Sequence, residues 1–198
     1  MNKKTILYVI TDRWADWESA YISSAINMLG DGRFENKTVS LTKDAVTSIG
    51  GVKCMPDFDL NSAPSDCAAL ILIGGMSWHN DDAVRFKPLI EACVKRGNVL
   101  CAICDACRFL GSLGYLNDAK HTANDLNELL QYPAYTNAQG FMHKQAVCDN
   151  NVVTANGTAT LEFAQEILRA LAVAPEQKIK AWYDFHKLGF YTAPMPEM

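Results

Sequence analysis

Short apolar runs alternate with amphipathic segments along the chain. Residues 5–11 form an uninterrupted apolar run rich in β-branched side chains, and residues 69–73 and 98–103 repeat this pattern. A continuous apolar run of about four to eight residues is typical of a strand that is buried on both faces of a sheet. We therefore predict buried strands at these three places, a more polar strand at residues 37–41 and a short strand at residues 152–155.

Segments with helical spacing of apolar residues lie between these strands. The clearest is residues 158–171, where Leu161, Ala164 and Leu168 fall on one stripe. Residues 49–52 contain a glycine pair and predict a turn or hairpin. The other expected helices cover residues 18–29, 87–96 and 105–113 and the beginning of the C-terminal tail, residues 175–189.

Strands and helices that alternate in this order predict parallel strands joined by right-handed crossovers. The expected fold is therefore α/β, a three-layer α/β/α sandwich around a mostly parallel sheet of the flavodoxin type. The length suits one domain at residues 1–173, followed by a helical extension at residues 174–198 that is not a separate domain. Ligands bind at the carboxyl ends of parallel strands, so function is expected in the loops after residues 11, 73 and 103.

Composition narrows the class of protein. The 198 residues include 22 acidic and 18 basic side chains, and 49% are apolar, which is too apolar for a disordered chain. The sequence has no run of basic residues, so we expect no nucleic-acid or membrane-surface partner. The first apolar run is shorter than the core of a signal peptide, and no stretch approaches the ~20 residues of a membrane span. We expect a cytoplasmic protein, whose seven cysteines are mostly thiols.

The loop after residue 103 holds the most informative cysteine. A buried strand turns directly into a helix at Cys104, which is the arrangement of a nucleophile elbow. A helix N-terminus lowers the pKa of a thiol, and Arg108 would reinforce this effect whereas Asp105 would oppose it. We therefore predict that Cys104 is a reactive thiol.

The two neighbouring loops supply candidates for a site around this thiol. Gly75 follows a buried strand, so its backbone N–H and that of Asp105 or Ala106 could form an oxyanion hole. Glu18 lies in the first turn of the first helix, and we expect it to point across the strand ends at Cys104. A carboxylate next to a thiol would share a proton with it, so the two pKa values would belong to the pair rather than to either group.

Cys104 and Cys107 also form a CxxC motif, which Cys101 extends. A shared metal is not expected, because alternation along the strand places Cys101 on the face opposite Cys104. We predict neither a metal nor a cofactor. A redox pair of Cys104 and Cys107 stays open as an alternative, although Cys107 is expected to be packed within the helix.

Together these motifs resemble the ThiJ/PfpI family, also called the DJ-one superfamily, which has the class I glutamine amidotransferase-like fold. The resemblance covers about residues 4–172. Its motifs occur in the order of the family: DWE at 16–18, SIGGV at 48–52, ALILIGG at 69–75, AIC at 102–104, KHT at 120–122 and VVTANG at 152–157.

The resemblance implies roles for three residues. Cys104 matches the elbow cysteine of the family, Glu18 matches the glutamate that hydrogen-bonds it, and Gly75 matches the oxyanion-hole glycine. Members resembling this chain include peptidases, glyoxalase-like or deglycase-like enzymes, chaperones and oxidation sensors, most of them dimers or higher oligomers. The resemblance thus implies a homodimer with a small-molecule substrate and a role in the stress response.

The chain departs from the family at both usual histidine positions. Peptidase-type members carry His directly after the elbow cysteine, where this chain has Asp105. Other members carry His at the position of Asn124. A Cys–His pair is therefore not supported, which argues against peptidase activity. Asn124, His121 and His79 are candidate auxiliary residues. Two further histidines are expected to be surface or structural residues: His143 and His186.

Two hypotheses about function follow. In the favoured one, the chain is an enzyme in which Cys104, assisted by Glu18, attacks a reactive carbonyl, an amide or an ester, as a hydrolase or glyoxalase-like enzyme would. In the alternative, the chain is an oxidative-stress sensor or a protective chaperone-like protein whose Cys104 oxidises without turnover. Both hypotheses call for a thiolate near neutral pH.

Overall fold

The computed structural model describes residues 3–196 and contains a seven-stranded sheet and a separate two-stranded hairpin. The sheet strands are β1 (Lys4–Val9), β2 (Phe34–Ser40), β5 (Phe58–Asp59), β6 (Ala69–Leu72), β7 (Val99–Ile103), β8 (Ala146–Asp149) and β9 (Val152–Ala155). Their order is β5-β2-β1-β6-β7-β9-β8, and all neighbours are parallel except β8, which runs antiparallel to β9. The hairpin pairs β3 (Val46–Thr47) with β4 (Lys53–Cys54).

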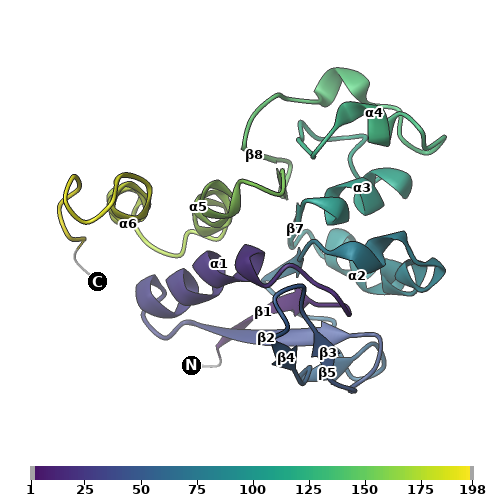
Figure 1. Cartoon of the computed structure of the whole chain (residues 1–198), viewed down its shortest axis with the longest axis horizontal. Coiled ribbons are helices and arrows are strands. Elements are labelled where there is room, and N and C mark those ends of the chain that lie inside the picture. Colours follow the sequence, from purple (N-terminus) through teal and green to yellow (C-terminus); the bar gives the residue numbers. More distant parts are fainter. Residues whose placement is uncertain (1–2, 197–198) are drawn as a thin grey trace.

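Helices cover both faces of this sheet (Figure 1). One face carries α1 (Asp16–Leu29) and α5 (Thr160–Ala170), and α6 (Glu176–Leu188) packs beside α5. The other face carries α2 (Lys87–Lys95), α3 (Asp105–Ser112) and the short α4 (Leu126–Leu129). The predicted three-layer α/β/α sandwich is confirmed. No helix within residues 3–196 is long and apolar enough to cross a membrane.

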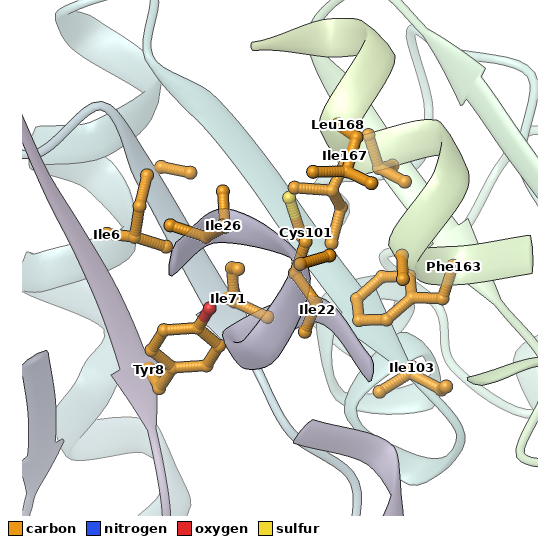
Figure 2. Packing of buried hydrophobic residues seen from close by; sticks show 14 of the residues in the cluster. Ile6, Tyr8, Ile22, Ile26, Ile71, Cys101, Ile103, Phe163, Ile167 and Leu168 are labelled. Atoms are coloured by element: carbon orange, nitrogen blue, oxygen red, sulfur yellow. The ribbon is translucent and has the colours of Figure 1, made fainter. Parts of the chain in front are cut away.

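The central strands are buried on both faces, which explains their continuous apolar sequences. In β1, Ile6 and Tyr8 face α1 and α5, whereas Leu7 and Val9 face α2 and α3. All four side chains are at most 3% exposed. Figure 2 shows the first of these two cores, where side chains of the sheet meet those of α1 and α5: Ile6, Tyr8, Ile71, Cys101 and Ile103 against Ile22, Ile26, Phe163, Ile167 and Leu168.

The sequence pattern located the long elements but missed the short ones. The predicted strands and helices are present within a few residues of their expected bounds, and the turn at residues 49–52 joins β3 to β4. The strands β5 and β8 were not predicted, because they have two and four residues and no fully buried side chain. The 3₁₀ helices η1 (Met76–His79) and η2 (Asp81–Phe86) were missed for the same reason of length.

The aromatic residues of the C-terminal tail divide into two groups. Trp182 of α6 is 1% exposed and packs edge-on against Tyr21 of α1, with ring centroids 6.2 Å apart. The Tyr183 hydroxyl donates a hydrogen bond to Glu162 at 2.9 Å. Phe190 and Tyr191, beyond the helix, are exposed. The tail therefore joins the α1 and α5 layer through α6.

Candidate active site

The turn between β7 and α3 holds Cys104 in a strained backbone conformation. Its φ is 59° and its ψ is −131°, a backbone conformation that residues other than glycine rarely adopt. Its N–H donates to the carbonyl of Ala155 at 3.0 Å, and its own carbonyl accepts from the N–H of Cys107 at 2.9 Å. These bonds fix the turn as a nucleophile elbow with Cys104 at its apex.

Glu18 reaches this elbow from α1 and is completely buried. Its Oε2 accepts a hydrogen bond from the N–H of Gly74 at 2.8 Å. A Cβ atom at Gly74 would lie 2.5 Å from Oε2 of Glu18 and 2.7 Å from Cβ of Cys104. The missing side chain of Gly74 is therefore what lets the carboxyl group and the cysteine approach each other.

The Glu18 carboxyl group titrates near neutral pH. Burial raises the pKa of Glu18 to about 7, and the Asp105 carboxylate adds to the rise. The Gly74 N–H and the Cys104 thiol work in the opposite direction, because both stabilise the carboxylate. Oε1 of Glu18 is buried and makes no hydrogen bond of normal geometry with residues 3–196. A carboxyl group in this state can both accept and return a proton.

The prediction of a lowered thiol pKa is wrong. Burial raises the pKa of Cys104 to about 11, and the nearby carboxylates of Glu18 and Asp105 contribute to this rise. Hydrogen bonds from the Asn124 side chain and the Asp105 backbone lower it only in part. A second negative charge beside two carboxylates is unfavourable, so the thiol keeps its proton at neutral pH.

Arg108 does not lower the thiol pKa as predicted. Its guanidinium donates one hydrogen bond to the Tyr132 hydroxyl and another, of 3.0 Å, to the carbonyl of Trp78. The side chain is buried between these segments and packs against the Tyr132 ring. Arg108 thus ties α3 to the loops around it.

Asn124 contacts the sulfur from the other side. Its Nδ2 donates to Sγ of Cys104 at 3.3 Å, while its Oδ1 accepts from the N–H of Gly157 at 2.8 Å. The second bond orients the amide, because only its NH₂ group is then free to face the sulfur. A Cβ atom at Gly157 would lie 2.8 Å from Sγ, so a larger residue would crowd the thiol. The sequence analysis did not single out Gly157, although the VVTANG motif ends on it.

Cys104 opens into a surface cavity of about 630 Å³. His143 is exposed, as expected of a surface residue, and it lines this cavity. Lys144, which the sequence analysis did not single out, lines it as well. The full lining comprises Cys104, Thr122, Ala123, Asn124, Asp125, Leu126, Phe141, His143, Lys144, Gln145, Asn156, Gly157 and Thr158.

The model of the DJ-1/PfpI family matches residues 4–170 of the chain. This protein belongs to the DJ-1/PfpI family. The match confirms the resemblance that the sequence motifs indicated. It also covers every element that surrounds Cys104, from β1 to α5.

Two relatives from Bacillus subtilis (strain 168) match nearly the whole chain. YdeA is 37% identical over 188 residues, covering 95% of this chain and 93% of its own. YoaZ is 33% identical over 196 residues, covering 94% and 91%. Both are named uncharacterized proteases.

Solved structures of the family agree with this fold. The DJ-1 superfamily protein Atu0886 from Agrobacterium tumefaciens has a TM-score of 0.83 and 33% identity, covering 92% of this chain and 99% of its own. A thiJ/pfpI family protein from Bacillus anthracis has a TM-score of 0.85 and 30% identity, covering 94% and 92%.

Three other predicted site residues of this DJ-1/PfpI chain are the oxyanion-hole candidates Gly75 and Asp105 and the auxiliary candidate His79. Gly75 has a φ of 148°, and a Cβ there would lie 2.6 Å from the carbonyl oxygen of Arg13, so the position requires glycine. The backbone N–H of Asp105 favours the thiolate of Cys104 and lowers the pKa of this thiol. Nε2 of His79 lies 3.3 Å from Oδ2 of Asp105, so His79 stands beside the elbow but outside the cavity lining.

His121 and Cys107 are not brought to the cavity. His121 is fully buried, with its ring nitrogens 2.7 Å from the Tyr135 hydroxyl and 2.8 Å from the Ala119 carbonyl. Cys107 is also fully buried, and its thiol donates toward the carbonyls of Ala102 and Ala155. Within the described chain, no three His, Cys, Asp or Glu side chains gather as metal ligands would.

Proposed function

We propose that this protein is a cysteine-dependent enzyme in which Cys104 attacks a small electrophile and Glu18 is its general base. The observation that carries the proposal is that a buried carboxyl group whose pKa is about 7 lies beside the elbow cysteine, where Gly74 leaves room for both. A base is most effective when its pKa lies near the working pH. Glu18 is thus suited to take the thiol proton as the sulfur attacks.

In the proposed first step, Sγ of Cys104 bonds to the carbonyl carbon of the substrate, and the thiol proton moves to Glu18. The π electron pair of the carbonyl moves to its oxygen, where the backbone N–H groups of Gly75 and Asp105 are the proposed donors. From an aldehyde, Glu18 then returns the proton to give a hemithioacetal. From an ester, the intermediate expels an alkoxide that takes the proton, and water later hydrolyses the thioester.

Aldehydes and esters suit this site better than peptides. Cleavage of an amide requires a proton on the leaving amine, which is far more basic than the alkoxide of an activated ester. Glu18 would have to supply that proton from the buried side of the sulfur, because the amide of Asn124, on the cavity side, does not titrate. The cavity volume of about 630 Å³ is that of a small-molecule site. The names of the Bacillus relatives favour hydrolysis, which an activated ester would undergo without a strong acid.

The raised thiol pKa removes the resting thiolate that both hypotheses expected, and this counts most against the sensor without turnover. Peroxides oxidise the thiolate rather than the thiol. Burial and the carboxylates of Glu18 and Asp105 keep Cys104 protonated at rest. A base that removes the proton during attack makes the same site competent for catalysis.

The test compares turnover of glyoxal, p-nitrophenyl acetate and an unstructured peptide. We expect Cys104→Ala to abolish turnover and Glu18→Gln to lower kcat/KM by about 10²–10⁴, the usual contribution of general-base catalysis. Cys148→Ala, which removes an exposed thiol on β8, is the matched control and should keep full activity.

Undiminished turnover in Cys104→Ala would overturn the proposal. Peptide cleavage as fast as ester cleavage would overturn the substrate preference. Oxidation of Cys104 by one equivalent of hydrogen peroxide, with no turnover of any of the three compounds, would favour the sensor instead.

A further inference from the structure

We propose that the cavity over Cys104 selects electrophiles that carry a carboxylate, and that Lys144 is the residue that binds this group. The inference rests on the proposed function, because it assumes that the other end of the same molecule meets the Cys104 sulfur. It adds a substrate class, a carbonyl compound with an anionic end, and a specificity-determining residue.

The backbone around Lys144 is held firmly in the cavity wall. Its N–H donates to the carbonyl of Met142 at 2.8 Å, and its carbonyl accepts from the Thr122 hydroxyl at 2.9 Å. The carbonyl of the next residue, Gln145, accepts from the N–H of Asn156 at 3.1 Å. Thr122 and Asn156 belong to the same two segments that contact the sulfur, so the backbone of Lys144 is fixed relative to Cys104.

The positive charge of Lys144 is available to a ligand. Within residues 3–196, the ion pairs do not include Lys144. The acidic side chain in the same lining, Asp125, is engaged in capping α4, where its Oδ1 accepts from the N–H of Asn127 at 2.9 Å and from its side-chain amide at 3.1 Å. Lys144 therefore brings to the cavity an ammonium group that makes no ion pair within the described chain, while the Asp125 carboxylate of the same lining is directed to the α4 cap.

The rest of the electrostatic field restricts where an anion can bind. The chain has a net charge of −4, and the floor of the site contains the carboxyl groups of Glu18 and Asp105. An anionic group is repelled from the sulfur itself and attracted toward Lys144. A substrate with a carbonyl at one end and a carboxylate at the other meets both conditions.

The test uses two alkylating reagents that differ only in charge, iodoacetate and iodoacetamide. Each forms a bond from Sγ of Cys104 to its methylene carbon and releases iodide, so the ratio of the two rate constants reports on attraction of the carboxylate. Rates are measured on Cys104 by peptide mass spectrometry at low salt. The proteins are the wild type, Lys144→Met, Lys144→Arg and the control Lys95→Met, at the exposed end of α2.

We expect the iodoacetate to iodoacetamide ratio to fall about fivefold in Lys144→Met, as for one unit charge acting through partly screened solvent. The ratio should be kept in Lys144→Arg and Lys95→Met, and 1 M salt should bring the wild-type ratio to that of Lys144→Met. An unchanged ratio in Lys144→Met would overturn the inference. Alkylation needs no turnover, so failure of the enzyme assays would reject the proposed function and leave this ratio as an independent result.

Discussion

Cys104 lies between two walls that differ in their access to water. We call Glu18 and Gly74 the inner wall, since both are buried, and Asn124 and Gly157 the outer wall, since they border the cavity. Each wall provides one hydrogen-bonding side chain and one glycine that allows a close approach. The two walls therefore contain similar groups with different chemical roles, because burial changes the protonation and accessibility of each group.

Burial makes the inner wall the place for proton chemistry. A carboxyl group without water has a raised pKa, whereas an exposed amide has no proton to exchange near neutral pH. The outer wall instead positions the sulfur and admits the substrate. The comparison teaches that changes to the inner wall should alter stability and its pH dependence, and changes to the outer wall should alter the accessibility of the thiol.

The largest effect is expected at the inner carboxyl group. Burial raises the pKa of Glu18 from 4.5 to about 7 in the folded state, so the folded chain binds more protons than the unfolded chain between these pH values. The stability that protonated Glu18 contributes is present below about pH 4.5 and is lost as the pH rises through about 7. At about 1.4 kcal/mol for each pKa unit, the loss is roughly 3 kcal/mol.

The side chain introduced by Glu18→Gln cannot ionise, so the free energy of unfolding of this variant should lack the pH-dependent contribution of Glu18. Urea unfolding of both proteins between pH 4.5 and 8 measures it. The stability of the variant relative to the wild type should increase with pH by up to about 3 kcal/mol. Parallel stability curves for the two proteins would show that Glu18 is not the buried titrating group that the inner wall requires.

A smaller loss is expected when the inner glycine is replaced. In Gly74→Ala, the new Cβ would lie 2.7 Å from Cβ of Cys104 and 2.9 Å from the carbonyl oxygen of Ile103, neither of which is a flexible chain end. Overpacking of this kind costs about 1–3 kcal/mol, and we expect the upper part of that range. The urea midpoint measures the change, and a midpoint equal to that of the wild type would contradict the close packing of the inner wall.

The inner wall was more accessible to sequence analysis than the outer wall. Glu18 and Gly74 each follow an apolar run whose pattern predicts a buried strand, so their place at the strand ends followed from local signals. In the outer wall, Asn124 was a candidate through the family resemblance, but Gly157 was not singled out. The cavity residues His143 and Lys144 precede β8, a half-exposed edge strand of four residues with no such pattern. Their place in the cavity beside Cys104 depends on the antiparallel pairing of β8 with β9, and a strand this short has no sequence pattern that predicts its pairing.

The direction of the thiol pKa could not be predicted either. A helix N-terminus and a nearby arginine are visible in the sequence and favour a low pKa. The largest opposing contribution is burial, which only the packed structure contains. The carboxylates of Glu18 and Asp105, both expected near the thiol, add to it. Arg108 bonds Tyr132, a residue of a distant loop, and this choice of partner has no local signal.

The smallest effect on stability, with a clear effect on the thiol, is expected for Gly157→Ala in the outer wall. The new Cβ would lie 2.8 Å from Sγ of Cys104, 3.2 Å from its Cβ and 3.4 Å from Oδ1 of Asn124, and the one contact shorter than 3.0 Å is to a side-chain end that can shift. The free energy of unfolding should therefore change by less than about 1 kcal/mol. Because the methyl group covers the sulfur, alkylation of Cys104 by iodoacetamide should slow about tenfold, equivalent to about 1.4 kcal/mol in the barrier. The exposed Cys148 serves as an internal reference for reagent reactivity. A loss of stability as large as that of Gly74→Ala, or an unchanged rate at Cys104, would mean that the two walls do not differ as argued.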